Sequence, residues 1–179
     1  MCWNYNIKAL IWKRFKVLWR ARPSSEVQKS KRYIISLRNP ISRQLSAFNW
    51  RRRLVFVEGQ KRLQFPGEHE VFSQFSTASD YAEALFDGSG NLNLPQAKGQ
   101  FYIHHFPEGI HFHAADVIER SAKENILAVL AQETLSADMQ RYFNIKVEYR
   151  YKANQSVSAL LSERALENLI RYCKADFDL

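Results

Sequence analysis

The stretch RYIISLRNPISRQLSAFNWRRR, residues 32–53, constrains the fold of this chain more than any other part of it. Its beginning, residues 32–37, is rich in apolar and β-branched residues, which predicts a short buried strand. Asn39 is a good N-cap and Pro40 suits the first position of a helix, so a helix that continues over residues 41–56 is expected directly after the strand. That helix carries apolar residues at the spacing i, i+4, i+7, which predict its buried face: Ile41, Leu45 and Phe48.

Beyond this stretch, helical patterns alternate with one further apolar run. Residues 124–134 hold that run and predict a second strand, despite its alanines. Helices are expected over residues 72–86 (entered at Ser76 or Thr77), after Gly109, over 135–145 (capped by Ser136) and over 161–177 (capped by Ser162). Loops are expected over residues 58–70, 87–99 and 146–158. Strands that alternate with helices predict an α/β fold with a parallel sheet.

Length and composition fit one globular domain with a core of its own. The chain has 179 residues, of which 46% are hydrophobic and 13% aromatic, and these values exclude wholesale disorder. Its net charge of +8 is unevenly distributed: residues 1–62 hold 16 Lys and Arg but two carboxylates, whereas residues 63–179 hold 10 Lys and Arg and 16 Asp and Glu. The positive field of the first third attracts phosphate, sulfate, nucleic acid or an anionic membrane, and charge alone does not choose among them.

The first 31 residues are interpreted as a basic amphipathic helix and a loop that precede the domain of residues 32–179. Residues 5–22 place apolar side chains at helical spacing with Lys and Arg around them. Such a helix either packs on the domain with a solvated basic face or contacts a membrane surface or a polyanion. No apolar run of about 18 residues and no secretory signal pattern occur, so a cytoplasmic or peripheral membrane location is expected. Cys2 and Cys173 form no disulfide framework, which suits a reducing compartment.

Arg38 follows the predicted strand directly, at the edge where the parallel sheets of open α/β proteins bind ligands. Its guanidinium can bind two oxygens of one phosphate. Ser46 lies eight residues further on, and Arg43 lies one turn before Ser46 on the same flank of the helix. Because Pro40 has no N–H to offer, a phosphate that reaches both Arg38 and Ser46 lies along this flank. These residues favour an anion-binding site, and a solvated helix face is the alternative.

Residues 38–48, RNPISRQLSAF, resemble the signature Arg-[Asp/Asn]-Pro-x-x-Arg-x-x-Ser-x-Tyr of the sulfotransferase superfamily. In that family the signature binds the 3′-phosphate of the donor 3′-phosphoadenosine 5′-phosphosulfate. The resemblance implies that Arg38 and Ser46 bind this phosphate and that Arg43 supports them. Phe48 stands where the family commonly has Tyr, which removes one hydroxyl.

Two later stretches, residues 126–145 and 161–179, are similar to carbohydrate-type sulfotransferases. The first matches a family segment with an apolar strand, a Glu, an Asp and a helix, and the second matches the closing helix. The resemblance thus covers residues 32–179, patchily in the middle, and implies a P-loop-like sulfotransferase fold with a central parallel sheet flanked by helices. By the same resemblance, residues 149–158 form a loop that closes over the donor, with Lys152 and Asn154 as candidate ligands.

The implied activity is the transfer of a sulfuryl group from this donor to a hydroxyl of a carbohydrate, without a metal. One part of the family's pattern is absent, the 5′-phosphosulfate loop Pro-Lys-x-Gly-(Thr/Ser)-(Thr/Ser) between a strand and a helix. No glycine precedes Arg38, so no glycine-containing phosphate loop can form there. Two alternatives are therefore expected. The chain is either a C-terminal fragment or truncated product of an active enzyme, incomplete at its N-terminus, or it is a non-catalytic remnant that binds a nucleotide or a polyanion.

Four histidines stand close together in residues 104–113, HHFPEGIHFH. Sulfuryl transfer to a hydroxyl needs a general base near the acceptor, for which His104 or His105 is the candidate; ordinary half-buried or surface histidines are the alternative. On a strand, His111 and His113 would point to one face as metal ligands, but no cysteine lies nearby and no metal is expected.

Glu133 and residues 50–53 are two further polar features of the sequence. Glu133 follows the second apolar run, where the sulfotransferase resemblance places a carboxylate that is often structural. Trp50 and Arg51–Arg53 can bind an anionic glycan acceptor or be solvated. They also permit RNA stacking, but nothing else resembles an RNA-binding motif, so no nucleic-acid partner is expected.

Overall fold

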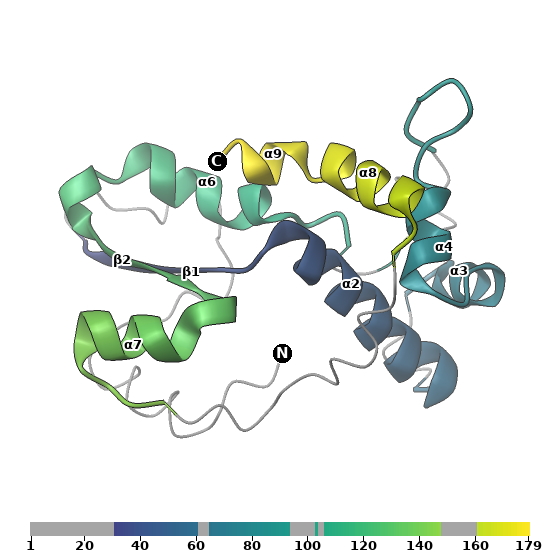
Figure 1. Ribbon diagram of the computed structural model, residues 1–179. Helices are drawn as coiled ribbons and strands as arrows, with labels where there is room; N and C mark the ends of the chain where they lie inside the picture. Colours follow the sequence, from purple (N-terminus) through teal and green to yellow (C-terminus); the bar gives the residue numbers. More distant parts are fainter. Residues whose placement is uncertain (1–30, 61–64, 94–102, 104–105, 148–160) are drawn as a thin grey trace. The chain divides into compact units, whose positions relative to one another are not determined.

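The computed structural model describes residues 31–60, 65–93, 103, 106–147 and 161–179, and this part of the chain combines helices with a small parallel sheet (Figure 1). The chain divides into two compact units. Unit 1 consists of Met1–Asn39 and Phe112–Ala153, and unit 2 consists of Pro40–His111 and Asn154–Leu179. The described part is therefore loosely α/β, as the alternation of strand and helix patterns predicted.

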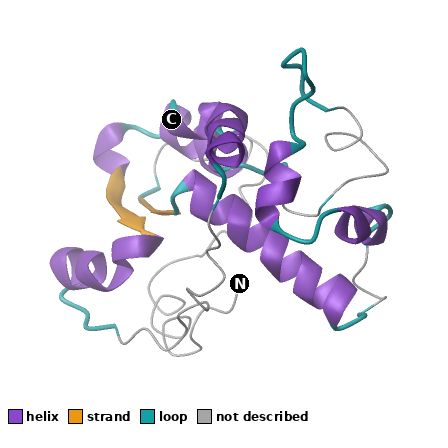
Figure 2. Cartoon of the chain, turned by 45° about the vertical axis from the view of Figure 1, so that its right-hand side comes forward, coloured by secondary structure: helices purple, strands orange, loops and turns teal. Residues whose placement is uncertain are grey.

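Unit 1 contains a two-stranded parallel sheet, drawn in orange in Figure 2. β1 (Tyr33–Leu37) pairs in parallel with β2 (Ile126–Ala131), and both strands were predicted from their apolar runs. Successive side chains of a strand point to opposite faces. The buried residues of β2 pack on α7 (Leu135–Phe143) and form one apolar cluster with it: Ala128, Leu130, Leu135 and Met139. Leu127 and Val129, on the other face of β2, are exposed.

The start of α7 differs from the prediction that Ser136 is its N-cap. The N-cap position lies two residues earlier, at Thr134, which makes no side-chain cap, and the helix begins at Leu135. The Ser136 hydroxyl instead donates a hydrogen bond to the carbonyl oxygen of Val147, at 3.2 Å. Asn144 ends the helix in the left-handed conformation, at φ 53°, which Asn tolerates better than most residues. The prediction of a serine cap is therefore wrong here, because Ser136 makes its hydrogen bond with a residue that lies beyond the end of the helix.

Unit 2 is helical. α2 (Pro40–Arg51) begins at Pro40 as predicted and continues into a π-helix, η2 (Arg52–Val57), where the Glu58 N–H donates to the carbonyl of Arg53. The other helices are α3 (Glu68–Gln74), α4 (Ala78–Glu83), α8 (Glu163–Tyr172) and α9 (Lys174–Phe177). Phe48 of α2 is fully buried in an apolar core, with Ile41 and Leu45 packed against that core, so the predicted buried face of this helix is confirmed.

Side-chain caps explain where two helices of unit 2 begin. Thr77 caps α4 in a capping box with Asp80, and Ser162 caps α8 by accepting from the N–H of Ala165, as predicted. The helix predicted over residues 161–177 is interrupted at Cys173, so it forms α8 and α9. The predicted loop over residues 58–70 is wrong at its end, because α3 begins at Glu68.

α6 (Ile110–Arg120) follows Gly109 as predicted, and it begins in unit 2 and continues into unit 1. Two single turns of 3₁₀-helix flank β2: η4 (Lys123–Asn125) and η5 (Gln132–Thr134).

Some predictions fall on residues that the structure does not describe. They are the helix of residues 5–22 and four candidate site residues: His104, His105, Lys152 and Asn154. Within the described ranges, no helix is both long and apolar enough to cross a membrane.

Candidate functional site

The sulfotransferase-like motif occupies the connection from β1 to α2. β1 ends at Leu37, α2 begins at Pro40, and Arg38 and Asn39 join them. Arg38 belongs to unit 1 and is half-buried, and within the described part of the chain its guanidinium makes no hydrogen bond or ion pair. A guanidinium at the carboxyl end of a parallel strand, without an internal counter-ion among the described residues, can bind an external anion.

Glu133 connects the carboxyl ends of the two strands of unit 1. Its Oε1 accepts a hydrogen bond from the backbone N–H of Asn39 at 3.0 Å, across 94 residues of sequence. Asp138, in the first turn of α7, accepts hydrogen bonds from the N–H of Ala131 and the hydroxyl of Thr134, both at 2.9 Å. The carboxylates of Glu133 and Asp138 therefore both accept hydrogen bonds from backbone N–H groups at the carboxyl ends of the strands, where Arg38 also lies.

Ser46 and Arg43 lie on α2, in unit 2. Both residues are half-buried, and the Ser46 hydroxyl makes no hydrogen bond within the described residues. Burial lowers the pKa of the Arg43 guanidinium from its usual value, and the carboxylates of Asp176 and Glu108 oppose this change. Arg43 therefore faces acidic groups of its own unit. Whether Arg38 and Ser46 bind one phosphate stays a prediction, since they belong to different units.

Asp176 connects the C-terminal segment to the first turn of α6. Its Oδ1 accepts a hydrogen bond from the N–H of His111 at 2.7 Å. Gly109 lies so close that a Cβ atom built there would be 2.4 Å from the same oxygen. The carboxylate thus stabilises the positive end of the α6 dipole, at a place where only glycine leaves enough room for it. The tertiary cap was not predicted, because it joins residues 65 apart in the sequence.

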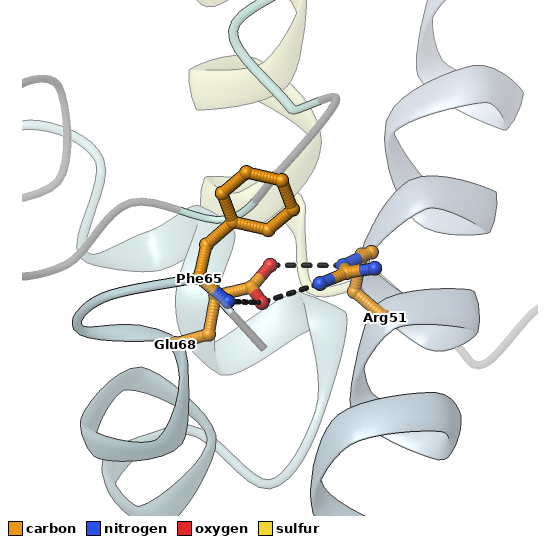
Figure 3. A network of polar contacts seen from close by, with 3 residues as sticks. All are labelled: Arg51, Phe65 and Glu68. Atoms are coloured by element: carbon orange, nitrogen blue, oxygen red, sulfur yellow. Dashed lines mark hydrogen bonds and ion pairs between the residues drawn. The ribbon is translucent and has the colours of Figure 1, made fainter. Parts of the chain in front are cut away.

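Arg51 is not available to an anionic ligand, contrary to the interpretation of Arg51–Arg53 as one exposed group. Its side chain forms a two-pronged ion pair with Glu68 (Figure 3): Nε to Oε1 is 2.9 Å and Nη2 to Oε2 is 2.5 Å. The N–H of Phe65 donates to the same Oε2 at 2.9 Å, and Arg51 and Glu68 are only 4% and 0% exposed. The pair holds the end of α2 against the start of α3, which explains why α3 begins inside the predicted loop.

The rest of that group consists of Trp50, Arg52 and Arg53. Trp50 is 39% exposed, and the guanidinium carbon of Arg53 lies 5.3 Å from its ring centroid. Arg53 also pairs with Glu58 at 3.1 Å, so its charge is partly compensated. Arg52 stacks over Phe56. Of residues 50–53, the ring of Trp50 and the guanidinium groups of Arg52 and Arg53 therefore remain outside the buried ion pair.

The histidine segment lies on a helix rather than on a strand in its second half. His111 is in the first turn of α6, and positions 111 and 113 of an α-helix are about 200° apart around its axis, so they do not share a face. The strand geometry considered for a two-histidine metal site is therefore wrong. In the described part of the chain, no group of three or more His, Cys, Asp and Glu side chains could hold a metal ion.

Two buried polar residues next to the motif were missed by the sequence pattern. Gln44, one turn after Pro40, and Cys173, which bears a thiol, are only 1% and 3% exposed. Burial is the main cause that raises the pKa of this thiol to about 11. Positions 40, 44 and 48 follow one face of α2, so the helical spacing contained the signal for the burial of Gln44, but its polar side chain is not typical of a core.

Comparison with protein-family models, with curated proteins and with solved structures finds no match for this chain. Its function is therefore inferred from the residues of the motif and their surroundings.

Proposed function

We propose that this chain is a sulfotransferase-like protein, which binds 3′-phosphoadenosine 5′-phosphosulfate and transfers its sulfuryl group to a hydroxyl of a carbohydrate. The observation that carries the proposal is the position of Arg38 in a strand–turn–helix connection. It directly follows a strand of a parallel sheet and precedes the helix that bears Arg43 and Ser46. The proposal includes the finer fold: β1 and β2 would belong to the central sheet of the P-loop-like sulfotransferase fold.

The chemistry assigns a separate task to each candidate residue. Arg38 and Ser46 bind the 3′-phosphate, and Lys152 and Asn154 contribute from the loop over the donor. The acceptor oxygen forms a bond to sulfur while the bond from sulfur to the 5′-phosphate oxygen breaks, and His104 or His105 takes the hydroxyl proton. Direct displacement needs alignment and charge stabilisation and no metal. Arg43 supports the phosphate from one turn away, while its own counter-charges are Asp176 and Glu108.

A second candidate function is the binding of a nucleotide or another polyanion through the 3′-phosphate motif alone, without turnover. It is favoured by residues 1–37, which hold no glycine and so provide no glycine-containing loop for the 5′-phosphosulfate. Incubation with sulfur-labelled donor and a panel of carbohydrates separates the two functions. Labelled product supports transfer, whereas nucleotide binding without product supports the non-catalytic function.

Calorimetric titration with adenosine 3′,5′-bisphosphate tests the shared part of both functions. We expect micromolar or tighter binding to the wild type and a loss of about 2–4 kcal/mol in Arg38→Ala, because the phosphate loses its charged partner. Arg141→Ala removes an equal charge from the exposed surface of α7 and serves as the matched control. Equal affinities of the wild type and Arg38→Ala would refute the assignment of Arg38.

A further inference from the structure

The apolar surface of α8 extends beyond the part that the core of unit 2 covers. Ala165 and Leu169 are buried, at 0% and 1% exposure, and Asn168 donates hydrogen bonds to two carbonyls of the α4 segment. Leu166 and Ile170 remain 40% and 48% exposed. At 100° per residue, the exposed pair lies about 100° around the helix from the buried pair. The helix therefore has a second apolar face, next to the one that its own core uses.

This second face lies on a segment with further exposed apolar side chains. Phe177 of α9 and Leu179 are 48% and 36% exposed. Single exposed apolar residues are normal on a soluble protein, but a leucine and an isoleucine one turn apart, followed by two more, are typical of an interaction surface. The segment is yellow in Figure 1, where α8 and α9 follow one another along the chain.

The charges beside this face are arranged in a self-complementary way. Glu163 and Glu167 are exposed near the start of α8, and Lys174 is exposed just beyond its end. Arg171 is also basic, but its guanidinium lies over Phe86, 4.3 Å from the ring centroid, and donates to the carbonyl of Gly90. Arg164 is exposed at the start of α8 too, but it lies about 120–160° around the helix from Leu166 and Ile170, away from this face. Glu163 at one end of the face and Lys174 at the other attract a second copy of the same helix in the antiparallel orientation. A parallel copy would bring like charges together.

We propose that α8 pairs with α8 of a second copy of this chain in an antiparallel, two-fold symmetric dimer. A two-fold axis near residue 168 brings Leu166 of one copy against Ile170 of the other and Glu163 against Lys174. The same surface is used by both copies, as in most symmetric dimers, and the opposed helix dipoles also favour this orientation. The inference goes beyond the proposed function and does not depend on it.

Sedimentation velocity over a concentration series tests the dimer. Because one helix pair is smaller than a standard interface of about 1,600 Å², we expect a dissociation constant in the micromolar range. Leu166→Lys and Ile170→Lys should each weaken dimerisation at least about tenfold. Leu127→Lys is the matched control, since Leu127 of β2 has a similar exposure of 39%, and it should leave the dissociation constant unchanged.

Charge exchange tests the antiparallel orientation and does not depend on the apolar variants. Glu163→Lys and Lys174→Glu should each weaken the dimer about threefold to tenfold at low salt, and the double variant should recover to within about twofold of the wild type. A wild type that stays monomeric up to about 200 µM, well above the micromolar dissociation constant expected for this helix pair, would overturn the proposal. A dimer that is insensitive to the apolar substitutions, or in which the double charge variant is the weakest, would overturn it as well.

Discussion

Asp176 accepts a hydrogen bond from the backbone N–H of His111 at 2.7 Å, so a carboxylate three residues before Leu179 caps α6. The same carboxylate is the largest of the nearby charges that raise the pKa of Arg43. One acidic side chain thereby connects the first turn of α6 with α2, within unit 2. The close approach of Gly109 makes this arrangement sensitive to small changes.

Gly109→Ala should destabilise the protein by about 1–3 kcal/mol, because the added Cβ atom would lie 2.4 Å from Oδ1 of Asp176. Asp176→Ala alone should cost about 1–2 kcal/mol through the lost cap. In the double variant the steric conflict is gone, so the two costs should not add. Urea unfolding of the four proteins measures the coupling, and strict additivity would contradict the predicted contact.

Glu68→Gln should cost about 3–5 kcal/mol in the free energy of unfolding, because it leaves the buried charge of Arg51 without its carboxylate. Glu58→Gln removes one partner of the exposed pair with Arg53 and is the matched control, with an expected effect below about 1 kcal/mol. Chemical denaturation measures both. Similar losses in the two variants would show that burial does not distinguish these pairs.

Ser162→Ala should destabilise the protein by about 1 kcal/mol, since the hydroxyl that accepts from the Ala165 N–H is lost from the start of α8. Ser162→Thr preserves a hydroxyl that can accept from the Ala165 N–H and donate to the carboxylate of Glu83, and it should retain most of the stability. Ser136→Ala should cost less, because Ser136 lies inside α7 and caps no helix, and its hydroxyl donates a single long hydrogen bond, at 3.2 Å, to the carbonyl of Val147. If thermal unfolding ranks Ser136→Ala as the more damaging change, the assigned caps are wrong.

Stability should fall as the pH rises from about 9 to about 11, because burial raises the pKa of Cys173 to about 11. The unfolded chain releases this proton at the lower, usual pKa, so the folded state is favoured below it and loses that advantage as the pH approaches the folded pKa. Burial also raises the pKa of Tyr81, which acts in the same direction. Cys173→Ala should therefore show a decline that is smaller by about 2–3 kcal/mol, but not absent.

Urea unfolding at a series of pH values measures this difference as a slope, which separates it from the packing that Cys173→Ala loses at every pH. The contribution of Tyr81 remains in both proteins and is the internal reference. Parallel declines in the wild type and Cys173→Ala would show that the thiol does not titrate differently in the folded state.

Local patterns predicted the elements whose formation depends on neighbouring residues. The start of α2 at Pro40, the caps Thr77 and Ser162, and the two apolar strands all depend on residues within about one helical turn or one short run. The order of the motif was likewise readable: Arg38 after a strand, and Arg43 and Ser46 on the next helix. These features need no knowledge of the rest of the chain.

Only tertiary structure decided which polar residues are buried and where they are paired. Arg51 and Arg53 are neighbours with the same chemistry, yet one is buried against Glu68 and the other is exposed beside Glu58. Glu133 and Asp176 find their backbone partners 94 and 65 residues away. The physical reason is that the desolvation of a charge depends on the atoms that surround it in space, whereas helix and strand propensities depend on the chain itself.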